Sequence, residues 1–399
     1  MNIAVVPRPV QVGLSHGSFP TADATVSGPL ADYAAEVLGL GVVATGATVE
    51  LVLGEVSTPG GHTIEITTTG VRIAADAPAG LFAALQTLRQ LAACAPTGSL
   101  PCCTIEDHPR FAYRGAMLDV ARHFFSVADV KRYIDDLALL KINYLHLHLT
   151  DDQGWRLEVL SRPELTRLGA TTQVGGAGGR GGLFYTQDEY REIVSHAASR
   201  FVTIVPEIDM PGHTNAAIVA YPQLGETPTD PYEGIEVGFS SRAIGSDETY
   251  AFVEDVLREV AALTPGPYLH LGGDESLATS DEDFLAFIAR ATAIAARHGK
   301  TLIGWHEMGR SRELPTGTVG QYWSYTRPQE NAAEHTMSFV EQGGAVILSP
   351  ADVAYLDIKY AADDELGLVW ADGPTTLQQS YDWEPTAIIP GVDENNILG

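Results

Sequence analysis

Tyr268-Leu269-His270-Leu271-Gly272-Gly273-Asp274-Glu275 is a short apolar run that ends on a glycine pair and two adjacent acids. The apolar part is typical of a buried strand in a parallel sheet. The glycines allow the backbone to turn sharply and to approach a ligand closely. Neighbouring side chains on a strand face opposite ways, so both acids can serve one substrate only if the strand breaks into a loop here.

The acid pair Asp274 and Glu275 suits the hydrolysis of a glycosidic bond. One acid can donate a proton while the other stabilises the positive charge that develops on the sugar. An isolated Asp-Glu pair would more often be a helix cap beside a solvated side chain. The surrounding His-x-Gly-Gly frame and the strand pattern described next favour the catalytic interpretation.

From Arg114 onward the chain alternates between strand-like and helix-like segments. The predicted strands are Gly115–Leu118, Tyr144–Leu149, Val202–Ile208, Tyr268–Leu271, Thr301–Gly304, Val319–Tyr322 and Ala345–Leu348. The predicted helices are Val127–Leu140, Asp188–Arg200, Asp247–Ala262 and Asp281–Arg297. Such alternation indicates an α/β fold, and the lack of a dinucleotide fingerprint favours a (β/α)8 TIM barrel over an open sheet.

Two long connections interrupt this alternation. Gly169–Gly182 is rich in glycine and is expected to be mobile. Met210–Ser246 is longer than a plain linker requires, which indicates an active-site loop.

The first part of the chain has a different pattern. We expect residues 1–108 to form a small α+β domain and residues 109–399 to form the barrel. Within the first domain, Ala47–Leu53 alternates as a strand, while Thr63–Thr68 and Gly70–Ala75 resemble a hairpin. Gly80–Leu91 has helical spacing.

The end of the barrel is incomplete by the same pattern. Only seven barrel strands can be counted before the chain stops at Gly399. Ile397-Leu398 resembles the approach to a further strand. We therefore expect a barrel that lacks its last strand and is truncated at its C-terminal end.

Composition excludes several classes of partner. The chain has 399 residues, 45% of them hydrophobic, and a net charge of −27, which opposes binding to nucleic acid and to an anionic membrane surface. No run reaches membrane-spanning length, and no signal peptide is visible. A cytoplasmic location is expected, or secretion if an export segment lies outside this chain.

The strand ends carry residue types that suit sugar recognition. In a barrel, functional groups collect at the carboxyl ends of the strands. Aromatic rings stack on the apolar faces of a sugar, and Arg and Asp suit its hydroxyl edge. The candidates are Arg122, Asp151, His213, Asp274, Glu275, Trp305, Trp323, Tyr355 and Asp357.

Each candidate also has a plainer interpretation. Trp305 and Trp323 could be packing aromatics, and Arg122 could form a structural ion pair with Asp119 or Asp151. We interpret the remaining tryptophans near the end of the chain, Trp370 and Trp383, as structural.

His146 and His148 require a separate comparison. Two histidines at this spacing face the same side of a strand, as in some metal-dependent barrel hydrolases, and Asp151, His213 and Asp274 could complete such a site. Both histidines precede the strand end, and none of the four lysines lies at a strand end to serve as a carboxylated ligand. We therefore expect no metal and no cofactor, and keep a metal-dependent hydrolase as an alternative.

Six segments together resemble glycoside hydrolase family 20, the β-N-acetylhexosaminidases. They run in the family's order through residues 110–360, and residues 1–108 are similar to the small domain that often precedes that barrel. The segments are Arg114–Phe125, His146–Trp155, Pro206–His213, His270–Glu275, Gly304-Trp305 and Tyr355–Asp357.

The resemblance implies an exo-acting, retaining, substrate-assisted mechanism, in which the 2-acetamido oxygen of the substrate attacks the anomeric carbon. Glu275 would be the acid and base, Asp274 would hold the acetamido N–H, and Tyr355 would bind the acetamido carbonyl.

The resemblance also assigns roles to the surrounding residues. Trp305 and Trp323 would wall the pocket, and Arg122 and Asp357 would grip hydroxyls. A second pair behind the acid, Asp151 and His213, would tune Glu275.

The implied partner is an oligosaccharide or glycoconjugate that ends in N-acetylglucosamine or N-acetylgalactosamine. Family members usually continue into an eighth strand that closes the pocket, and this chain ends before that strand. The alternative is therefore a truncated, inactive carbohydrate-binding remnant of such an enzyme.

Overall fold

The computed structural model describes residues 4–95, 98–179, 181–227 and 229–399, and the chain forms two compact units. The first unit runs to Arg114 and also takes in Arg132–Asn143 and Ala197–Val202, while the remainder forms the second unit. The domain boundary at residues 108 and 109 stays a prediction. Arg180, inside the Gly-rich connection, and the first three residues lie outside the described residues.

The first unit is built around a seven-stranded sheet with the strand order β1-β7-β5-β6-β4-β2-β3. Its elements are β1 (Gln11–Pro20), β2 (Thr25–Ser27), α1 (Ala31–Leu38), β3 (Gly41–Val42), β4 (Val49–Leu53), β5 (His62–Ile66), β6 (Val71–Ala75), α2 (Pro78–Cys94) and β7 (Ser99–Asp107). The predicted hairpin is confirmed, because β5 pairs antiparallel with β6. The helix predicted at Gly80–Leu91 lies within α2.

Helix α2 buries one face in the core of this unit. Leu81, Leu85, Leu88 and Leu91 follow one another at helical spacing and are all buried. The sequence did not predict the remaining elements, which are β1, β2, β3, β7 and α1. Three of these are short or exposed, so their residues lack the alternation by which a strand is recognised.

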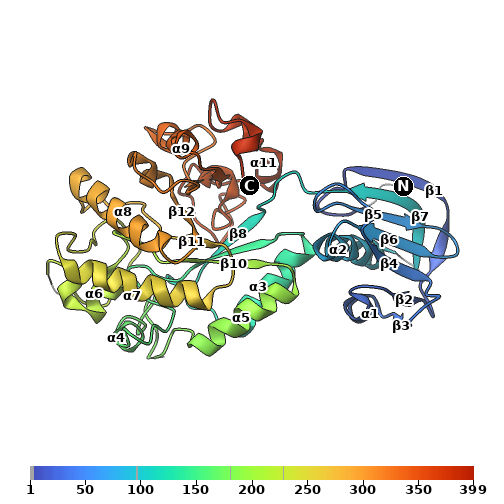
Figure 1. Cartoon of the computed structure of the whole chain (residues 1–399), viewed down its shortest axis with the longest axis horizontal. Coiled ribbons are helices and arrows are strands. Elements are labelled where there is room, and N and C mark those ends of the chain that lie inside the picture. The colour runs from blue at the N-terminus through green and yellow to red at the C-terminus, as the bar shows by residue number, and fades with distance from the viewer. Residues whose placement is uncertain (1–3, 96–97, 180, 228) are drawn as a thin grey trace. The chain divides into compact units, whose positions relative to one another are not determined.

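The second unit contains a curled sheet of seven parallel strands in chain order, which confirms the predicted TIM-barrel fold class and the lack of a complete eighth strand among the described residues. The strands are β8 (Gly115–Asp119), β9 (Tyr144–His148), β10 (Thr203–Glu207), β11 (Tyr268–His270), β12 (Thr301–Trp305), β13 (Val319–Tyr322) and β14 (Val346–Leu348). All seven agree with the predicted strands to within one residue at each end. In Figure 1 they form one curved layer.

Helices follow most of these strands along the chain. They are α3 (Val127–Leu139), α4 (Glu164–Arg167), α5 (Gln187–Ser199), α6 (Asn215–Ala220), η1 (Pro222–Leu224), α7 (Asp247–Leu263), α8 (Asp281–Ala296), η2 (His306–Arg310), α9 (Ala332–Glu341), α10 (Ala351–Ala354), α11 (Leu377–Asp382), η3 (Pro385–Ala387) and η4 (Glu394–Asn396). Helices α7 and α8 lie beside each other outside the strands (Figure 1). The hydroxyls of Ser246 and Ser280 cap their N-termini, which begin with acidic residues that the helix dipole favours.

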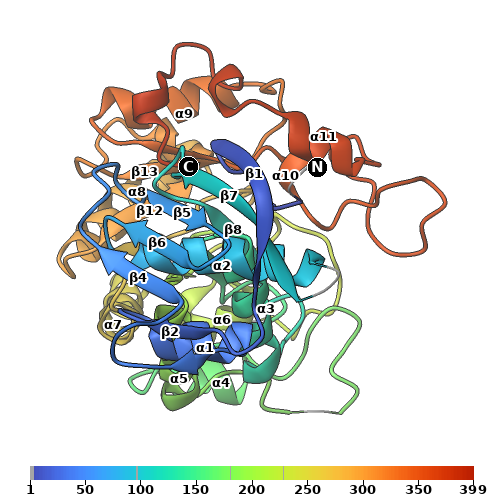
Figure 2. The same ribbon diagram turned by 90° about the vertical axis from the view of Figure 1, so that its right-hand side faces the viewer.

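The sheet order begins at β14 and ends at β8. Ile397 forms a parallel bridge with Val346, and the Leu348 N–H donates to the carbonyl of Gly399. Ile397-Leu398 therefore does approach the sheet as a strand would, beside β14. The segment between β14 and this bridge forms long irregular connections around α10 and α11 (Figure 2).

Parallel strands place all their carboxyl ends at one edge of the sheet, and this edge positions the candidate site. Glu207 at the end of β10 pairs in register with His148 on one side and with His270 on the other. No helix among the described residues is long and apolar enough to cross a membrane.

Candidate active site

The acid pair lies where β11 ends and the backbone leaves the strand. Gly272, Gly273 and Glu275 all have positive φ angles, of 68°, 103° and 39°. A Cβ on Gly272 would collide with the carboxyl of Asp209, and one on Gly273 would collide with Met308. Only glycines fit there, and the strained backbone of Glu275 turns both acids to the same side, as the sequence required.

A third acid, Asp209, lies against Asp274. Asp209 is 1% exposed, and its Oδ1 accepts the Gly273 N–H at 3.0 Å. Burial, and then the charge of Asp274, raises the pKa of Asp209 well above its usual range. Asp209 is therefore a neutral acid that can donate to Asp274. Burial raises the pKa of Asp274 above its usual value, and the charge of His213 and a hydrogen bond with Asp209 oppose that rise. Sequence reasoning missed Asp209, although it stands at a strand end in the Pro-Glu-Ile-Asp segment.

The predicted pair Asp151 and His213 lies directly behind the acids. His213 Nδ1 is 3.1 Å from Asp151 Oδ1, and His213 Nε2 is 3.5 Å from Glu275 Oε2 and 3.7 Å from Asp274 Oδ2. Burial alone would lower the pKa of His213, but the carboxylates of Asp151, Asp274 and Asp209 raise it well above its usual value. An imidazolium at this place stabilises negative charge on the acid pair.

Arg122 forms both of the ion pairs considered in its plainer interpretation. Its Nη1 lies 2.8 Å from Asp119 Oδ2, and its Nη2 lies 2.9 Å from Asp151 Oδ2. The side chain is still 32% exposed. A guanidinium held in this way keeps a fixed orientation and can offer its remaining N–H groups to a ligand. Sugar binding by Arg122 stays a prediction.

Trp305 is buried and is held at both its edge and its face. Its Nε1–H donates to Glu207 Oε1 at 2.9 Å, and its ring meets the His270 ring edge-on with 4.8 Å between centroids. The packing interpretation therefore applies to this residue, because one edge is fixed in the polar core below the strand ends, and its role as a pocket wall stays a prediction.

Trp323 is held by an acid that the sequence analysis did not identify. Its Nε1–H lies 3.0 and 3.1 Å from the two carboxyl oxygens of Glu307. Burial, and then the charge of Asp274, raises the pKa of Glu307 from 4.5 to about 8. Glu307 stands two residues after Trp305, so its position just past a strand end was the one available signal.

Glu307→Gln is expected to stabilise the protein relative to the parent more at pH 8 than at pH 5. A carboxyl whose pKa is higher in the folded protein than in the unfolded chain makes its full contribution to stability below pH 4.5. This contribution is lost as the pH rises from 4.5 to about 8, because the carboxyl of the unfolded chain ionises first. Glutamine stays neutral and still accepts the Trp323 N–H. Melting temperatures of both proteins at the two pH values test this, with the exposed Glu365→Gln as control. An equal difference at both pH values would contradict the raised pKa.

Tyr355, Asp357 and Trp370 form one group on the segment after β14. The Trp370 ring meets the Tyr355 ring edge-on at 5.1 Å, and Trp370 Nε1–H donates to Asp357 Oδ2 at 2.7 Å. Burial, and then the charge of Asp274, raises the pKa of Tyr355 well above its usual value, so the phenol is close enough to Asp274 to interact with it. Trp370, which we interpreted as structural, thus contacts two of the candidate site residues.

Four groups of buried or half-buried histidines and carboxylates have atoms close enough to consider a metal ion. In the two groups that contain His146 or His148, however, each of these rings lies 2.8 or 2.6 Å from Glu207 Oε2. Ligands bound to zinc at ~2.0–2.1 Å in a tetrahedron are about 3.3 Å apart. These contacts are therefore hydrogen bonds, and the groups would have to separate to admit an ion.

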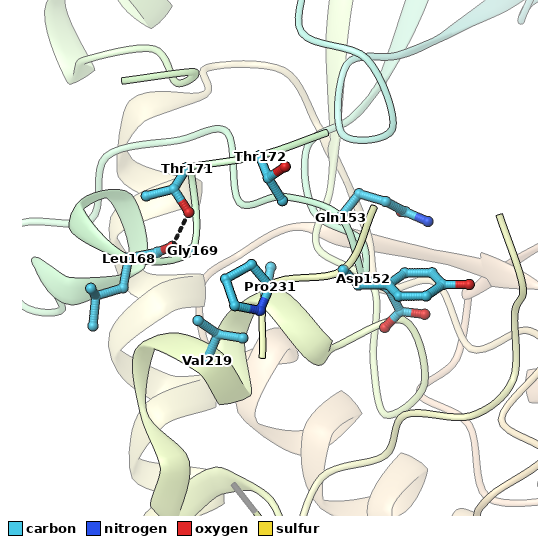
Figure 3. A pocket seen from close by; sticks show the side chains of 10 residues that line it. Asp152, Gln153, Leu168, Gly169, Thr171, Thr172, Val219 and Pro231 are labelled. Atoms are coloured by element: carbon cyan, nitrogen blue, oxygen red, sulfur yellow. Dashed lines mark hydrogen bonds between the residues drawn. The ribbon is translucent and has the colours of Figure 1, made fainter. Parts of the chain in front are cut away.

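A small pocket lies beside the site, where the two long connections meet. Figure 3 shows Thr171 and Thr172 of the Gly-rich connection, with Leu168 just before it, facing Val219 and Pro231 of the Met210–Ser246 connection. The Thr171 hydroxyl donates to the Leu168 carbonyl at 2.9 Å (Figure 3). Asp152, also on the pocket wall, follows Asp151 in the chain and accepts the Asn215 N–H. The second connection thus supplies both His213 and part of this wall.

Comparison with known families agrees with this geometry. The model described as "Glycosyl hydrolase family 20, catalytic domain" matches residues 111–282 and 276–399. The model described as "Glycosyl hydrolase family 20, domain 2" matches residues 2–108. Together the two models account for both parts of the chain.

Individual relatives are named as hexosaminidases or as a chitobiase. A beta-N-acetylhexosaminidase of Cellulomonas fimi is 42% identical over 427 residues, which cover 100% of this chain and 84% of that protein. An N,N'-diacetylchitobiase of Vibrio harveyi is 35% identical over 56% of this chain and 30% of its own length. A solved structure, the Streptomyces plicatus N-acetyl-beta-hexosaminidase in complex with Thio-NAglucal, superposes with a TM-score of 0.94 at 43% identity, covering 99% of this chain and 83% of that one.

Proposed function

This chain belongs to glycosyl hydrolase family 20 and is a glycosidase, and from that premise we propose that it is an exo-acting β-N-acetylhexosaminidase with a retaining, substrate-assisted mechanism. Its substrate is an oligosaccharide or glycoconjugate with a terminal β-linked N-acetylglucosamine or N-acetylgalactosamine. The observation that carries the proposal is the unequal placing of the two acids. Asp274 is 17% exposed and surrounded by Asp209, His213 and Tyr355, whereas Glu275 is 30% exposed.

The more exposed acid, Glu275, faces the leaving group in the proposed mechanism. It donates its proton to the glycosidic oxygen as the bond to the anomeric carbon breaks. The 2-acetamido oxygen of the same sugar attacks that carbon and forms an oxazolinium intermediate. Glu275 then takes a proton from a water molecule as the water oxygen attacks the anomeric carbon. The bond from that carbon to the acetamido oxygen breaks, which opens the oxazolinium ring and gives the β-anomer.

The inner acid, Asp274, orients the acetamido group. Its carboxylate accepts the acetamido N–H and stabilises the positive charge of the oxazolinium. Burial raises the pKa of Asp274, and neutral Asp209 on one side and cationic His213 on the other oppose this rise and favour the carboxylate that accepts. The Tyr355 hydroxyl, whose raised pKa keeps it protonated, donates to the acetamido carbonyl. These groups are arranged before the reaction begins, which is the main source of electrostatic catalysis.

The remaining candidates define the sugar pocket. Trp305 and Trp323 enclose the acetamido methyl, and each indole is fixed by a carboxyl on its N–H. Arg122 and Asp357 bind sugar hydroxyls, and Trp370 fixes the orientation of Asp357.

Hydrolysis of three aryl glycosides tests this function. The β-N-acetylglucosaminide and β-N-acetylgalactosaminide should be cleaved and should release the β-anomer first, as seen by NMR. The matching β-glucoside lacks the acetamido nucleophile and should not be cleaved. Comparable turnover of the glucoside would overturn the substrate-assisted mechanism, and a folded protein that binds N-acetylglucosamine without cleaving either acetamido sugar would support the carbohydrate-binding alternative.

Treatment with a chelator is expected to leave this turnover unchanged, because Asp274, Glu275 and Tyr355 perform the chemistry without an ion. The assay compares dialysed protein with and without EDTA, followed by added Zn²⁺. Loss of turnover with EDTA that zinc restores would support the metal-dependent alternative built on His146 and His148.

A further inference from the structure

A buried carboxylate, Glu207, binds several polar groups below the acid pair. It is 0% exposed at the end of β10, where its Oε1 accepts the Trp305 N–H. Its Oε2 is hydrogen-bonded to two rings of β9, His146 Nε2 at 2.8 Å and His148 Nδ1 at 2.6 Å. A buried carboxylate is costly unless it is satisfied in this way, so the three donors define one orientation for the group.

His148 continues the contacts toward the acid. Its second ring nitrogen, Nε2, lies 2.7 Å from Asp151 Oδ2, and Asp151 Oδ1 lies 3.1 Å from His213 Nδ1. His213 Nε2 is then 3.5 Å from Glu275 Oε2. His146, two residues away on the same strand, binds Glu207 but not Asp151. Two rings of β9 therefore bind Glu207, and of these two it is His148 that continues through Asp151 and His213 to Glu275.

The charges along this series alternate. Burial would raise the pKa of Glu207, but the charges of His148 and its neighbours hold it well below its usual range. Burial would lower the pKa of His148, but Glu207, Asp119 and Asp151 raise it well above 6.5. The other groups that face His148 or Glu207 are Arg122 beside Asp151, Asp209 at the end of β10, and His270 on β11. Burial lowers the pKa of His270 to about 4, so it is neutral.

We propose that His148 and Glu207 are positioning residues that join the pocket wall Trp305 to the acid Glu275 through Asp151 and His213. The inference rests on the proposed function, since it assigns the acid role to Glu275. Glu207 fixes the inner edge of the Trp305 indole, and with it the orientation of the ring that walls the sugar pocket in the proposed function. Through His148 it also fixes the rotation of Asp151, and hence of the His213 ring that faces the acid. One carboxylate thereby sets the relative positions of the pocket wall and the proton donor.

The matched substitutions His148→Asn and His146→Asn test this proposal. Both rings are almost fully buried and bind the same oxygen, but only His148 also binds Asp151, so the pair separates loss of the Glu207 contact from loss of the connection toward the acid. We expect His148→Asn to lower kcat/KM on the order of tenfold or more, because the acid loses its orientation. The alkaline limb of its pH profile should move to higher pH, because the site loses a positive charge. His146→Asn should keep the parental pH profile, and its kcat/KM should fall by less than about threefold.

Equal losses in the two variants, with both pH profiles unchanged, would overturn the proposal while leaving the proposed function intact if the parent protein is active. A second measurement needs neither a folded variant nor turnover. In the ¹⁵N spectrum of the parent, the rings of His148 and His213 should keep both ring protons at pH 8, and N-acetylglucosamine should shift both signals. A spectrum in which every ring is neutral at pH 8 would overturn the proposal.

Discussion

Glu275→Gln is expected to lower kcat/KM for N,N'-diacetylchitobiose by roughly a thousandfold, because glutamine cannot donate a proton to the departing sugar oxygen. The same variant should lose a far smaller factor of kcat/KM on a 2,4-dinitrophenyl glycoside, since dinitrophenolate leaves without protonation. Steady-state kinetics on the two substrates provide the measurement. A much larger loss on the first substrate than on the second reports the acid role directly, because a general loss of structure would lower kcat/KM on both substrates by the same factor.

Asp274→Asn is the matched control for this prediction. It sits one residue away and removes the acetamido acceptor, so the loss should be of similar size on both substrates. Melting temperatures of the two variants should lie close to that of the parent. If Glu275→Gln lost equally on both substrates, Glu275 would not be the proton donor, even if both variants were inactive.

The strands of the second unit could be predicted because their signal is local. Each is a short apolar run bounded by polar or glycine residues, and such a run is buried wherever the sheet places it. The strand ends follow from that pattern, and so do the candidates that stand there. The candidates at the strand ends were identified in this way, because a Trp or an acid just past a strand end is visible in the sequence alone.

Other residues that position the site could not be predicted, because their roles depend on contacts between segments that are distant in the sequence. Glu207 is the last residue of β10, and its partners come from β9 and β12, so its role exists only once these strands are assembled in one sheet. The neutral state of Asp209 and the raised pKa of Glu307 depend on burial and on Asp274. Trp370 contacts Tyr355 through an irregular segment that has no periodicity to identify it.

Arg156 is another residue of this kind, and it carries the largest stability prediction. Its guanidinium is 0% exposed and has no acidic partner among the contacts described, yet every nitrogen donates to backbone carbonyls. Burial lowers its pKa to about 10, so it remains charged at neutral pH. The accepting carbonyls belong to Val120, Ala121, Thr172 and Leu183.

Arg156→Met is expected to destabilise the protein by about 3–5 kcal/mol, because it leaves these buried carbonyls without donors. Methionine fills much of the same length, so the loss reflects the hydrogen bonds more than a cavity. Urea unfolding of the parent and the variant provides the measurement. Arg167→Met is the matched control, since Arg167 is 65% exposed and pairs only with Glu164, and it should change stability by less than about 0.5 kcal/mol.

The same substitution should also weaken substrate binding. Val120 and Ala121 lead directly from β8 to Arg122, and their carbonyls are held by Arg156. Without that support Arg122 no longer has a fixed position between Asp119 and Asp151, so KM should rise more than kcat falls. Added N-acetylglucosamine should then raise the unfolding midpoint of the parent more than that of Arg156→Met. An unchanged KM in a destabilised Arg156→Met protein would mean that the ion pairs of Arg122 alone hold it in place, and that Arg156 stabilises the fold without shaping the pocket.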